Sequence, residues 1–319
     1  MAVPVLPGND LSVNLRETVR RLPRSPGVYR FRDARGTVLY LGRATELRPR
    51  VASYWSKLRG RRHLTRMVAQ IDRVEAVACD GVHEATWLER NLLERSLPRW
   101  NRTRGGQETP VYLRLDTRPD APGLSVAHVR QEAVGVRYFG PYLGGERARQ
   151  TVSALHRILP LAHTGTRLRG AELDIARARG IGEIDAGALA AAVAAVLQRD
   201  PAAIVQARDD LLRARDRACT AMAFELAGRI QTELQALEWT SGPQRVTIPD
   251  AATQDRDVYG WSGGILVHFG IHAGRLDTWS QRSCAQVRAA QRLADTPPEW
   301  VGFAQRAAEL AVTLAGADR

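Results

Sequence analysis

The sequence PGVYRFRDARGTVLYLGRATELRPR, residues 26 to 50, predicts the element around which the rest of the chain is organised. It contains two short apolar and aromatic runs, Gly27–Phe31 and Thr37–Leu41. The four residues 33 to 36 between them begin with Asp and end with Gly, which is typical of a tight turn. Because two such runs flank a turn, the stretch predicts a β-hairpin, with a basic helix following Gly42.

This hairpin also places reactive side chains close together. Tyr29 lies on the first predicted strand and Tyr40 on the second, and Arg43, Arg48 and Arg50 follow in the basic helix. A phenol can pass on a proton, and a guanidinium can neutralise charge that develops on phosphate oxygens. The residue types therefore suit attack on a phosphate.

Length and composition limit the class of protein. A chain of 319 residues is long enough for two or three domains, and 44% hydrophobic residues are enough to build their cores. No apolar run approaches the roughly 20 residues of a membrane span, and the N-terminus lacks a signal-peptide pattern. Cys79, Cys219 and Cys284 lie far apart and form no metal-ligand pattern. These observations predict a reduced, cytoplasmic protein without a membrane partner.

The positive charge is concentrated in the first third of the chain. The net charge is +12, of which residues 1–104 hold +11 and the remaining 215 residues hold +1. Lys57 is the only lysine, so a coding bias toward arginine explains the choice of Arg but not its excess over acids in one segment. The excess predicts that this segment binds nucleic acid.

Further elements follow the hairpin. The apolar spacing predicts helices over Glu46–Lys57 and His63–Ile71, then a half-buried strand over Val74–Cys79. A third helix is expected over Val82–Ser96, with Asp80 as its cap. The order of strands and helices, ββααβα, predicts a small α/β domain with a mainly antiparallel sheet.

The hairpin carries a family resemblance. Gly27-Val28-Tyr29 and Tyr40-Leu41-Gly42 are similar to the paired signatures of GIY-YIG nucleases. The wider context, PGVY, YLGRA, Arg50 seven residues after Arg43, and then Tyr54, resembles the N-terminal nuclease of UvrC, the excision-repair subunit. The third helix adds EATWLERNLLERSLPRWN, which resembles the UvrC stretch that supplies the metal-binding glutamate and, twelve residues later, an asparagine.

The resemblance implies a role for each matching residue. A single divalent ion, Mg2+ or Mn2+, would bind Glu89 and the scissile phosphate. Tyr29 would activate the attacking water with help from Tyr40. The resemblance further implies that Arg43 and Arg50 hold the phosphate and that Tyr54 and Asn101 orient these groups.

Glu89 has an alternative role, and the sequence differs from UvrC proteins at two positions near the site. Glu89 could be an ordinary helical glutamate that pairs with a nearby arginine. Arg43 stands where UvrC proteins usually carry lysine, which keeps the charge but changes its geometry. Trp100 replaces a common tyrosine beside Asn101. Neither departure removes a group that the chemistry needs, so an altered rate or substrate preference is expected rather than loss of activity.

The middle of the chain begins with two expected strands, Val111–Leu115 and Leu124–Val129, and a helix over Ala148–Ile158. Between them, the YFGPY sequence of Tyr138–Tyr142 resembles a landmark that follows the nuclease in UvrC, and it is expected to be an aromatic turn in a core. Residues 162–180 contain no cysteine where UvrC proteins commonly have a cluster implicated in iron–sulfur binding, so no iron–sulfur cluster is expected.

Residues 186 to 239 show helical periodicity, with a new helix starting at Asp200-Pro201. The run MAFELAGRIQTELQAL resembles the UVR motif, a helical hairpin through which UvrC engages UvrB. The alternative is an ordinary helical pair that closes its own core. The apolar positions common to both interpretations are Met222, Leu226, Ile230, Leu234 and Leu237.

Gly242-Pro243 is an expected linker, and the segment after it resembles the start of the region that follows the UVR motif in UvrC. Its alternation predicts three short strands and a last helix, namely Val258–Trp261, Ile265–Ile271, Arg275–Ser280 and Pro298–Leu314.

Taken together, these patterns predict an α+β fold in four parts. They are a GIY-YIG nuclease domain (1–108), a connecting region with the YFGPY landmark (109–165), a helical UVR-like region (166–243) and C-terminal strands with a helix (244–319). The resemblance implies a shortened, Cho-like UvrC endonuclease without the RNase H-like nuclease and helix-hairpin-helix modules. Such an enzyme would make a single metal-dependent cut 3′ to a lesion in nucleotide excision or crosslink repair. The alternatives are a free-standing GIY-YIG nuclease acting without UvrB, and a non-catalytic adaptor that binds DNA or UvrB.

Overall fold

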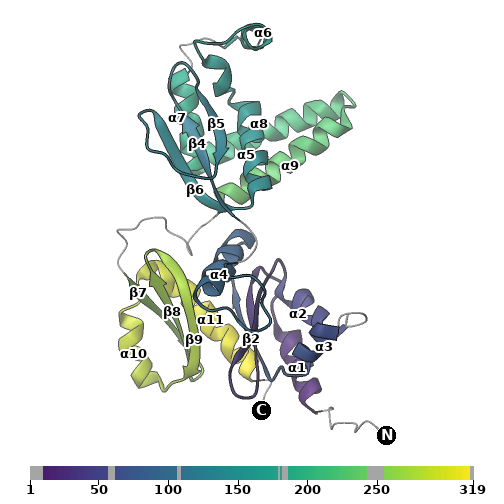
Figure 1. Cartoon of the computed structure of the whole chain (residues 1–319), viewed down its shortest axis with the longest axis vertical. Coiled ribbons are helices and arrows are strands. Elements are labelled where there is room, and N and C mark those ends of the chain that lie inside the picture. Colours follow the sequence, from purple (N-terminus) through teal and green to yellow (C-terminus); the bar gives the residue numbers. More distant parts are fainter. Residues whose placement is uncertain are drawn as a thin grey trace. The chain divides into compact units, whose positions relative to one another are not determined.

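The computed structural model describes residues 10–56, 62–105, 109–178, 180–181, 186–242 and 255–316. The chain forms two compact units, the first from residues 1–107 and 243–319 and the second from residues 108–242 (Figure 1). Both units combine helices with a small antiparallel sheet, which confirms the predicted α+β class.

The predicted hairpin forms the centre of the first unit. Strands β1 (Gly27–Arg32), β2 (Val38–Ala44) and β3 (Arg73–Ala78) make a fully antiparallel sheet in the order β2-β1-β3. In the turn, the Asp33 carboxylate accepts hydrogen bonds from the backbone N–H groups of Arg35 and Thr37, at 3.0 and 2.8 Å. This is the local hydrogen bonding for which Asp is favoured at the start of a turn.

Four helices surround this sheet in sequence order. Three of them were expected, and the first was not: α1 (Asp10–Arg21), α2 (Leu47–Ser56), α3 (Arg62–Val68) and α4 (Val82–Arg95). The expected end of the second helix at Lys57 lies outside the described residues. Asp80 as the cap of α4 was wrong, because the N-cap is Gly81 and the Asp80 carboxylate instead pairs with Arg306 at 2.6 Å.

The C-terminal layer of the first unit consists of a second antiparallel sheet and two helices. Its elements are β7 (Arg256–Ser262), β8 (Ile265–His272), β9 (Arg275–Ser283), α10 (Gln286–Ala294) and α11 (Pro298–Ala315). Helix α11 contacts β7 and β8 on one side and β3 on the other, and α4 contacts β9. The C-terminal segment that the sequence divides from the hairpin domain therefore packs with it in one unit.

A buried cation joins the two sheets of the first unit. Arg30 on β1 is only 5% exposed and pairs through Nε with Glu75 on β3, which is 2% exposed. A second arginine, Arg32, lies 2.9 Å from the same carboxylate oxygen. Arg30 also donates to the backbone oxygen of Trp279 at 2.7 Å, and its guanidinium lies 3.8 Å from the centre of the indole ring. Burial lowers the pKa of Arg30 to about 10, although the Glu75 carboxylate acts in the opposite direction.

The second unit has a three-stranded sheet in the order β5-β4-β6, formed by β4 (Pro110–Asp116), β5 (Gly123–Ala127) and β6 (Val136–Leu143). The YFGPY sequence lies within strand β6, so the expectation of a turn was wrong. Its last residue, Tyr142, is buried in the core of this unit, as the sequence predicted for the motif.

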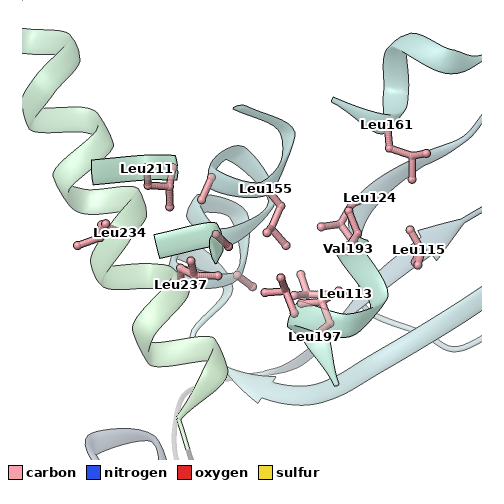
Figure 2. Packing of buried hydrophobic residues seen from close by; sticks show 14 of the residues in the cluster. Leu113, Leu115, Leu124, Leu155, Leu161, Val193, Leu197, Leu211, Leu234 and Leu237 are labelled. Carbon is pink, nitrogen blue, oxygen red and sulfur yellow. The ribbon is translucent and has the colours of Figure 1, made fainter. Parts of the chain in front are cut away.

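Helices of the second unit are α5 (Gly145–Ile158), the 3-10 helix η1 (Leu161–Thr164), α6 (Ala171–Ala178), α7 (Ala186–Leu197), α8 (Pro201–Thr220) and α9 (Phe224–Ser241). Asp200 caps α8 by accepting the N–H of Ala203 at 2.8 Å, which confirms the predicted break. Figure 2 shows leucines of the strands and helices gathered in one core, including Leu113, Leu155 and Leu237. No single helix in the described ranges is both long and apolar enough to cross a membrane, whereas the pair α7–α8, bent by 105°, meets that test by length and composition.

Met222 is an exception to the predicted apolar face. It lies in the turn between α8 and α9 with a φ of +56°, and it is 79% exposed. The other four members of the set, Leu226, Ile230, Leu234 and Leu237, pack in the core or against it. The two helices thus form the expected hairpin, with Met222 at its tip.

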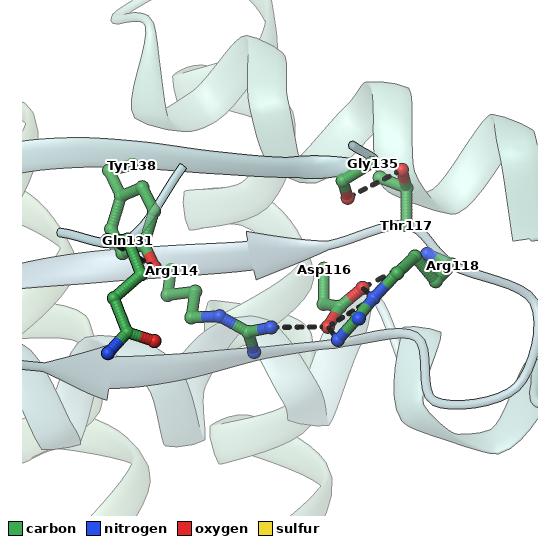
Figure 3. A network of polar contacts seen from close by, with 7 residues as sticks. All are labelled: Arg114, Asp116, Thr117, Arg118, Gln131, Gly135 and Tyr138. Atoms are coloured by element: carbon green, nitrogen blue, oxygen red, sulfur yellow. Dashed lines mark hydrogen bonds and ion pairs between the residues drawn. The ribbon is translucent and has the colours of Figure 1, made fainter. Parts of the chain in front are cut away.

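A carboxylate at the end of β4 holds two arginines in place (Figure 3). Asp116 is buried and accepts hydrogen bonds from Arg114 and Arg118, each at 2.6 Å. These hydrogen bonds lower the pKa of Asp116 to about 2 against the opposing effect of burial. Thr117 extends the connection to the next strand by donating to the Gly135 oxygen at 3.0 Å.

The Arg30–Glu75 pair gives a prediction about stability. Glu75→Ala leaves the Arg30 charge buried without its carboxylate, so the free energy of unfolding of the first unit should fall by about 3–5 kcal/mol. The control is Glu17→Ala, because Glu17 is an exposed partner of Arg20 and Arg21 at 3.5 and 3.6 Å. Its loss should change the free energy by less than about 1 kcal/mol. Urea unfolding followed by circular dichroism measures both, and similar effects for the two variants would contradict the structural role of the pair.

Candidate active site

Two glycines allow the hairpin side chains to approach one another. A Cβ atom at Gly27 would lie 2.3 Å from the backbone oxygen of Val77 on β3, so only glycine permits this strand contact. A Cβ atom at Gly42 would lie 2.7 Å from the Tyr29 hydroxyl and 2.8 Å from the Tyr40 ring. Gly42 therefore makes room for both phenols.

These phenols belong to a tyrosine cluster, formed by Tyr29, Tyr40 and Tyr54. Tyr29 comes from β1, Tyr40 from β2 and Tyr54 from α2, and their ring centres lie 5.9 to 6.2 Å apart. The Tyr29 and Tyr54 hydroxyls share a hydrogen bond of 2.8 Å, and the Tyr40 ring lies beside the Tyr54 ring, tilted by 59°. Phe31, two residues after Tyr29 on the same strand face, packs against all three rings.

Arg50 supplies the cation next to this cluster. Its guanidinium lies 5.5 Å from the centre of the Tyr54 ring, whose hydroxyl is hydrogen-bonded to Tyr29. Burial raises the pKa of Tyr29 and that of Tyr40, whereas Arg50 lowers both to a smaller extent. Both phenols are consequently protonated at neutral pH.

Glu89 and Arg43 form the second part of the site. The Arg43 backbone N–H donates to Glu89 Oε1 at 3.2 Å, and the Arg43 Nε lies 3.1 Å from Oε2. The Arg43 guanidinium also donates to the Thr86 hydroxyl, one turn before Glu89 on α4. The Glu89 side chain is 20% exposed. It lies near the tyrosine cluster, because it accepts the N–H of Arg43 and the preceding residue, Gly42, is packed against the Tyr29 hydroxyl and the Tyr40 ring. The arginine pairing considered as the alternative role of Glu89 does occur, and its partner is itself a candidate site residue.

Asn101 acts on the backbone of β2. Its side-chain oxygen accepts the N–H of Leu41 at 2.9 Å, and its amide nitrogen donates to the Leu41 oxygen at 2.8 Å. The neighbouring Trp100 N–H donates to the Leu39 oxygen at 3.1 Å. These bonds fix the strand at the residue between Tyr40 and Gly42.

The structure thus brings the seven candidate residues into two adjoining groups, with Asn101 supporting the strand between them. The sequence missed Phe31 and Thr86. Each had a signal in its spacing, because Phe31 is two residues from Tyr29 on a strand and Thr86 is three residues from Glu89 on a helix.

A divalent ion fits this site only when a bound substrate supplies further oxygen ligands. Among the residues that the structure describes, no three or more His, Cys, Asp or Glu side chains are grouped as a metal centre. Glu89 would be a single carboxylate ligand, and Arg43 contacts both of its oxygens. Mg2+ is commonly held by one or two carboxylates together with phosphate oxygens and waters. The residues present fit such a site when a bound phosphate completes it.

The hairpin region matches a known protein family. Residues 25–102 match the model of the UvrC-like GIY-YIG domain. The chain therefore contains a UvrC-like GIY-YIG domain, and that domain contains all seven candidate residues.

Curated relatives extend over more of the chain. The UvrABC system protein C of Trichlorobacter lovleyi is 36% identical over 151 residues, 47% of this chain and 25% of the relative. That of Anaeromyxobacter sp. is 32% identical over 266 residues, 78% of this chain and 36% of the relative. That of Desulforudis audaxviator is 31% identical over 293 residues, 86% of this chain and 47% of the relative. The chain thus spans about a quarter to a half of the length of the relatives it matches.

Solved structures give a partial match. The GIY-YIG N-terminal endonuclease domain of UvrC from Thermotoga maritima, bound to its catalytic divalent cation magnesium, is 30% identical. The match covers 28% of this chain and 96% of that structure, with a TM-score of 0.26.

Gly42 provides a test of how the tyrosine cluster is built. Gly42→Ala places a methyl group against the Tyr29 hydroxyl, so it should lower the free energy of unfolding by about 1–3 kcal/mol and change the near-ultraviolet circular dichroism of the tyrosines. Gly228→Ala, within helix α9, is the control, since a Cβ atom there meets nothing within 4 Å. An unchanged tyrosine signal in Gly42→Ala would contradict the close packing at this position.

Proposed function

We propose that this chain is a metal-dependent, Cho-like DNA endonuclease of nucleotide excision or crosslink repair in the cytoplasm, which makes one incision 3′ to a lesion. The observation that carries the proposal is the arrangement of the tyrosine cluster. The Tyr29 and Tyr54 hydroxyls share a 2.8 Å hydrogen bond, Arg50 lies 5.5 Å from the centre of the Tyr54 ring, and Glu89 accepts the backbone N–H of Arg43 on the strand that carries Tyr40. The match of residues 25–102 to the UvrC-like GIY-YIG domain supports it.

Binding of DNA would use the positive charge of the same segment. Residues 1–104 carry a net charge of +11. Arg43 and Arg50 would contact the scissile phosphate, because each lies next to one of the groups proposed to act on it. Arg43 would move its guanidinium from Glu89 to the phosphate, which releases the carboxylate for a cation.

Proton transfer would begin at Tyr29. Because burial keeps this phenol protonated, it does not act as a preformed phenolate. The hydroxyl of Tyr29 instead receives a proton from the attacking water as it passes its own proton to Tyr54 along their 2.8 Å hydrogen bond, and Tyr54 releases its hydroxyl proton to solvent, so each phenol ends the step neutral. Arg50, whose guanidinium lies 5.5 Å from the centre of the Tyr54 ring, would stabilise the negative charge that develops on the phenol oxygens during this transfer.

Glu89 would hold the metal ion, Mg2+ or Mn2+. When bound, the ion would offset negative charge on the phosphate and on the leaving oxygen. Asn101 would keep Tyr40 and Gly42 in place through its two bonds to Leu41.

The helical hairpin α8–α9 would bind UvrB through residues 203–237. Two apolar side chains at its tip support this partner role, since Met222 is 79% exposed and Phe224 is 70% exposed. Two large apolar side chains exposed within three residues of each other offer an apolar contact for another protein. The Leu226, Ile230 and Leu234 positions pack within the unit, so the tip rather than the whole helix face would make the contact.

The metal-site proposal predicts the effect of Glu89→Ala. Cleavage should be lost while DNA affinity stays nearly unchanged, because most of the affinity comes from arginine–phosphate contacts. Glu94→Ala is the matched control on α4, where Glu94 pairs with Arg90 and Arg275 at 2.8 and 3.3 Å, and it should still cut. Metal-dependent cutting by Glu89→Ala would remove Glu89 from this role.

Proton transfer by Tyr29 predicts a loss of rate without a loss of fold. Tyr29→Phe deletes one hydroxyl and keeps the ring, so single-turnover cleavage should slow by about 10²–10⁴-fold. Tyr112→Phe, in the second unit, should cut at the rate of the unaltered chain. If Tyr29→Phe matches that rate across the pH range, the phenol is structural and the base lies elsewhere.

Whether the chain makes one cut or two tests the function as a whole. In the C-terminal layer, Asp257 pairs with His268 at 2.7 Å, and Asp277 pairs with His272 at 2.6 Å. The other two acids in this part of the sequence that could serve a second nuclease site are Asp250 and Asp255. Asp255 accepts the backbone N–H of Ala273 at 3.1 Å, and Asp250 lies outside the described residues. A strand-labelled duplex with one lesion should therefore show a single boundary on the 3′ side, made more abundant by UvrA and UvrB. Dual incision would overturn the single-site proposal, and equal cutting of undamaged DNA without UvrB would favour a free-standing nuclease.

A further inference from the structure

Three arginines converge on a cavity in the C-terminal layer. The cavity has a volume of about 480 Å³ and is lined by Arg282, Ser283, Cys284, Ala285, Arg288 and Arg292. All three arginines are exposed. None forms an ion pair with a carboxylate in the described part of the chain, where most acids have an arginine or histidine partner. The cavity, called here the arginine pocket, therefore presents unneutralised positive charge.

The local structure adds to that charge. The pocket lies at the N-terminus of α10, whose N-cap is Ala285 with no side-chain hydrogen bond to the first turn. A helix N-terminus has a partial positive charge, so Arg288 in the first turn is in an unfavourable position. Arg292 is four residues later, which places two like charges side by side on the helix. Arginines placed where they repel one another and the helix N-terminus destabilise the fold, and such local costs are expected where the site binds an anion.

Neighbouring side chains limit where the anion lies. Arg292 is held beside Tyr259, with its guanidinium 5.4 Å from the ring centre. The adjoining cavity, which shares Arg292, is lined by Asp255, Asp257 and Asp295 and by Arg256, whose charge is paired with Glu299 at 3.4 Å. These acids repel an anion from that side and leave the three-arginine side as the favourable one.

We propose that the arginine pocket binds a phosphate group, carried either by the backbone of DNA or by a free nucleotide. Guanidinium groups donate paired hydrogen bonds to phosphate oxygens, and helix N-termini add backbone N–H donors. The volume also falls in the range of small-molecule sites, so it accommodates more than the phosphate itself.

The pocket is separate from the tyrosine cluster. Trp279 on β9 points toward Arg30 of β1, and Arg282 is three residues further along the same strand. Since side chains alternate along a strand, Arg282 lies on the opposite face of this sheet from Trp279. Occupation of the pocket therefore leaves the tyrosine cluster free, and the inference does not depend on the proposed incision.

The test measures binding without cleavage. The full chain, in metal-free buffer, is titrated with a fluorescein-labelled 20-base-pair duplex by anisotropy, and with inorganic phosphate and ATP by calorimetry. The variants are Arg288→Gln and the double variant Arg288→Gln/Arg292→Gln. Arg256→Gln is the control, because it also removes a positive charge from the C-terminal layer but lies on strand β7, outside the pocket.

The expected result has a salt signature. If DNA is the ligand, the double variant should weaken duplex binding about tenfold, and the slope of log K against log salt should become shallower by about 0.9, the value for one phosphate contact. If a free nucleotide is the ligand, duplex binding stays unchanged while ATP or phosphate binding is lost. The variants should fold, with a melting temperature equal to or above that of the unaltered chain in phosphate-free buffer, because like-charge repulsion is removed. Unchanged binding of all three probes, or equal losses in Arg256→Gln, would overturn the proposal.

Discussion

The buried ion pair between Arg30 and Glu75 is the interaction on which the organisation of the first unit depends. Strand β1 alternates its side chains, so Tyr29 and Phe31 face the tyrosine cluster while Arg30 faces the C-terminal layer. One strand thus carries the candidate chemistry on one face and the contact between two sheets on the other. A shift of one residue in its register would exchange both faces, so the ion pair also fixes the position of Tyr29.

The tyrosine cluster combines apolar surroundings with cations at its margin. Burial keeps the phenols of Tyr29 and Tyr40 neutral, and only Arg50 acts against that effect among the groups that shift both pKa values. The phenols of the cluster therefore stay protonated and unreactive until a substrate or cation brings further positive charge. The Arg43–Glu89 ion pair depends on the substrate in the same way, because Arg43 holds the carboxylate until a phosphate competes for its guanidinium. Both features make reactivity dependent on the substrate.

Local sequence patterns predicted the parts of this fold that depend on interactions between residues close together in the sequence. The Asp33–Gly36 turn, the Asp200 cap and the strand alternation of β7 to β9 all follow from neighbouring residues. The candidate site residues came from motif spacing, which does not show that Arg43 contacts both oxygens of Glu89. Errors arose where distant contacts decide the outcome. Asp80 pairs with Arg306 rather than capping its helix, and Arg30 finds its partner Trp279 across 249 positions of sequence.

That separation affects how the protein is made. The first unit is discontinuous, because residues 108–242 form a unit of their own between its two parts. On the ribosome, the hairpin sheet emerges early, but β9 and α11 emerge only after the whole second unit. Until then, the face with Arg30 and Glu75 has no cover from the C-terminal layer, and a nascent chain in this condition is open to misassociation. An inserted unit that folds quickly would bring its ends together and shorten the effective loop, so the second unit would also assist the assembly of the first.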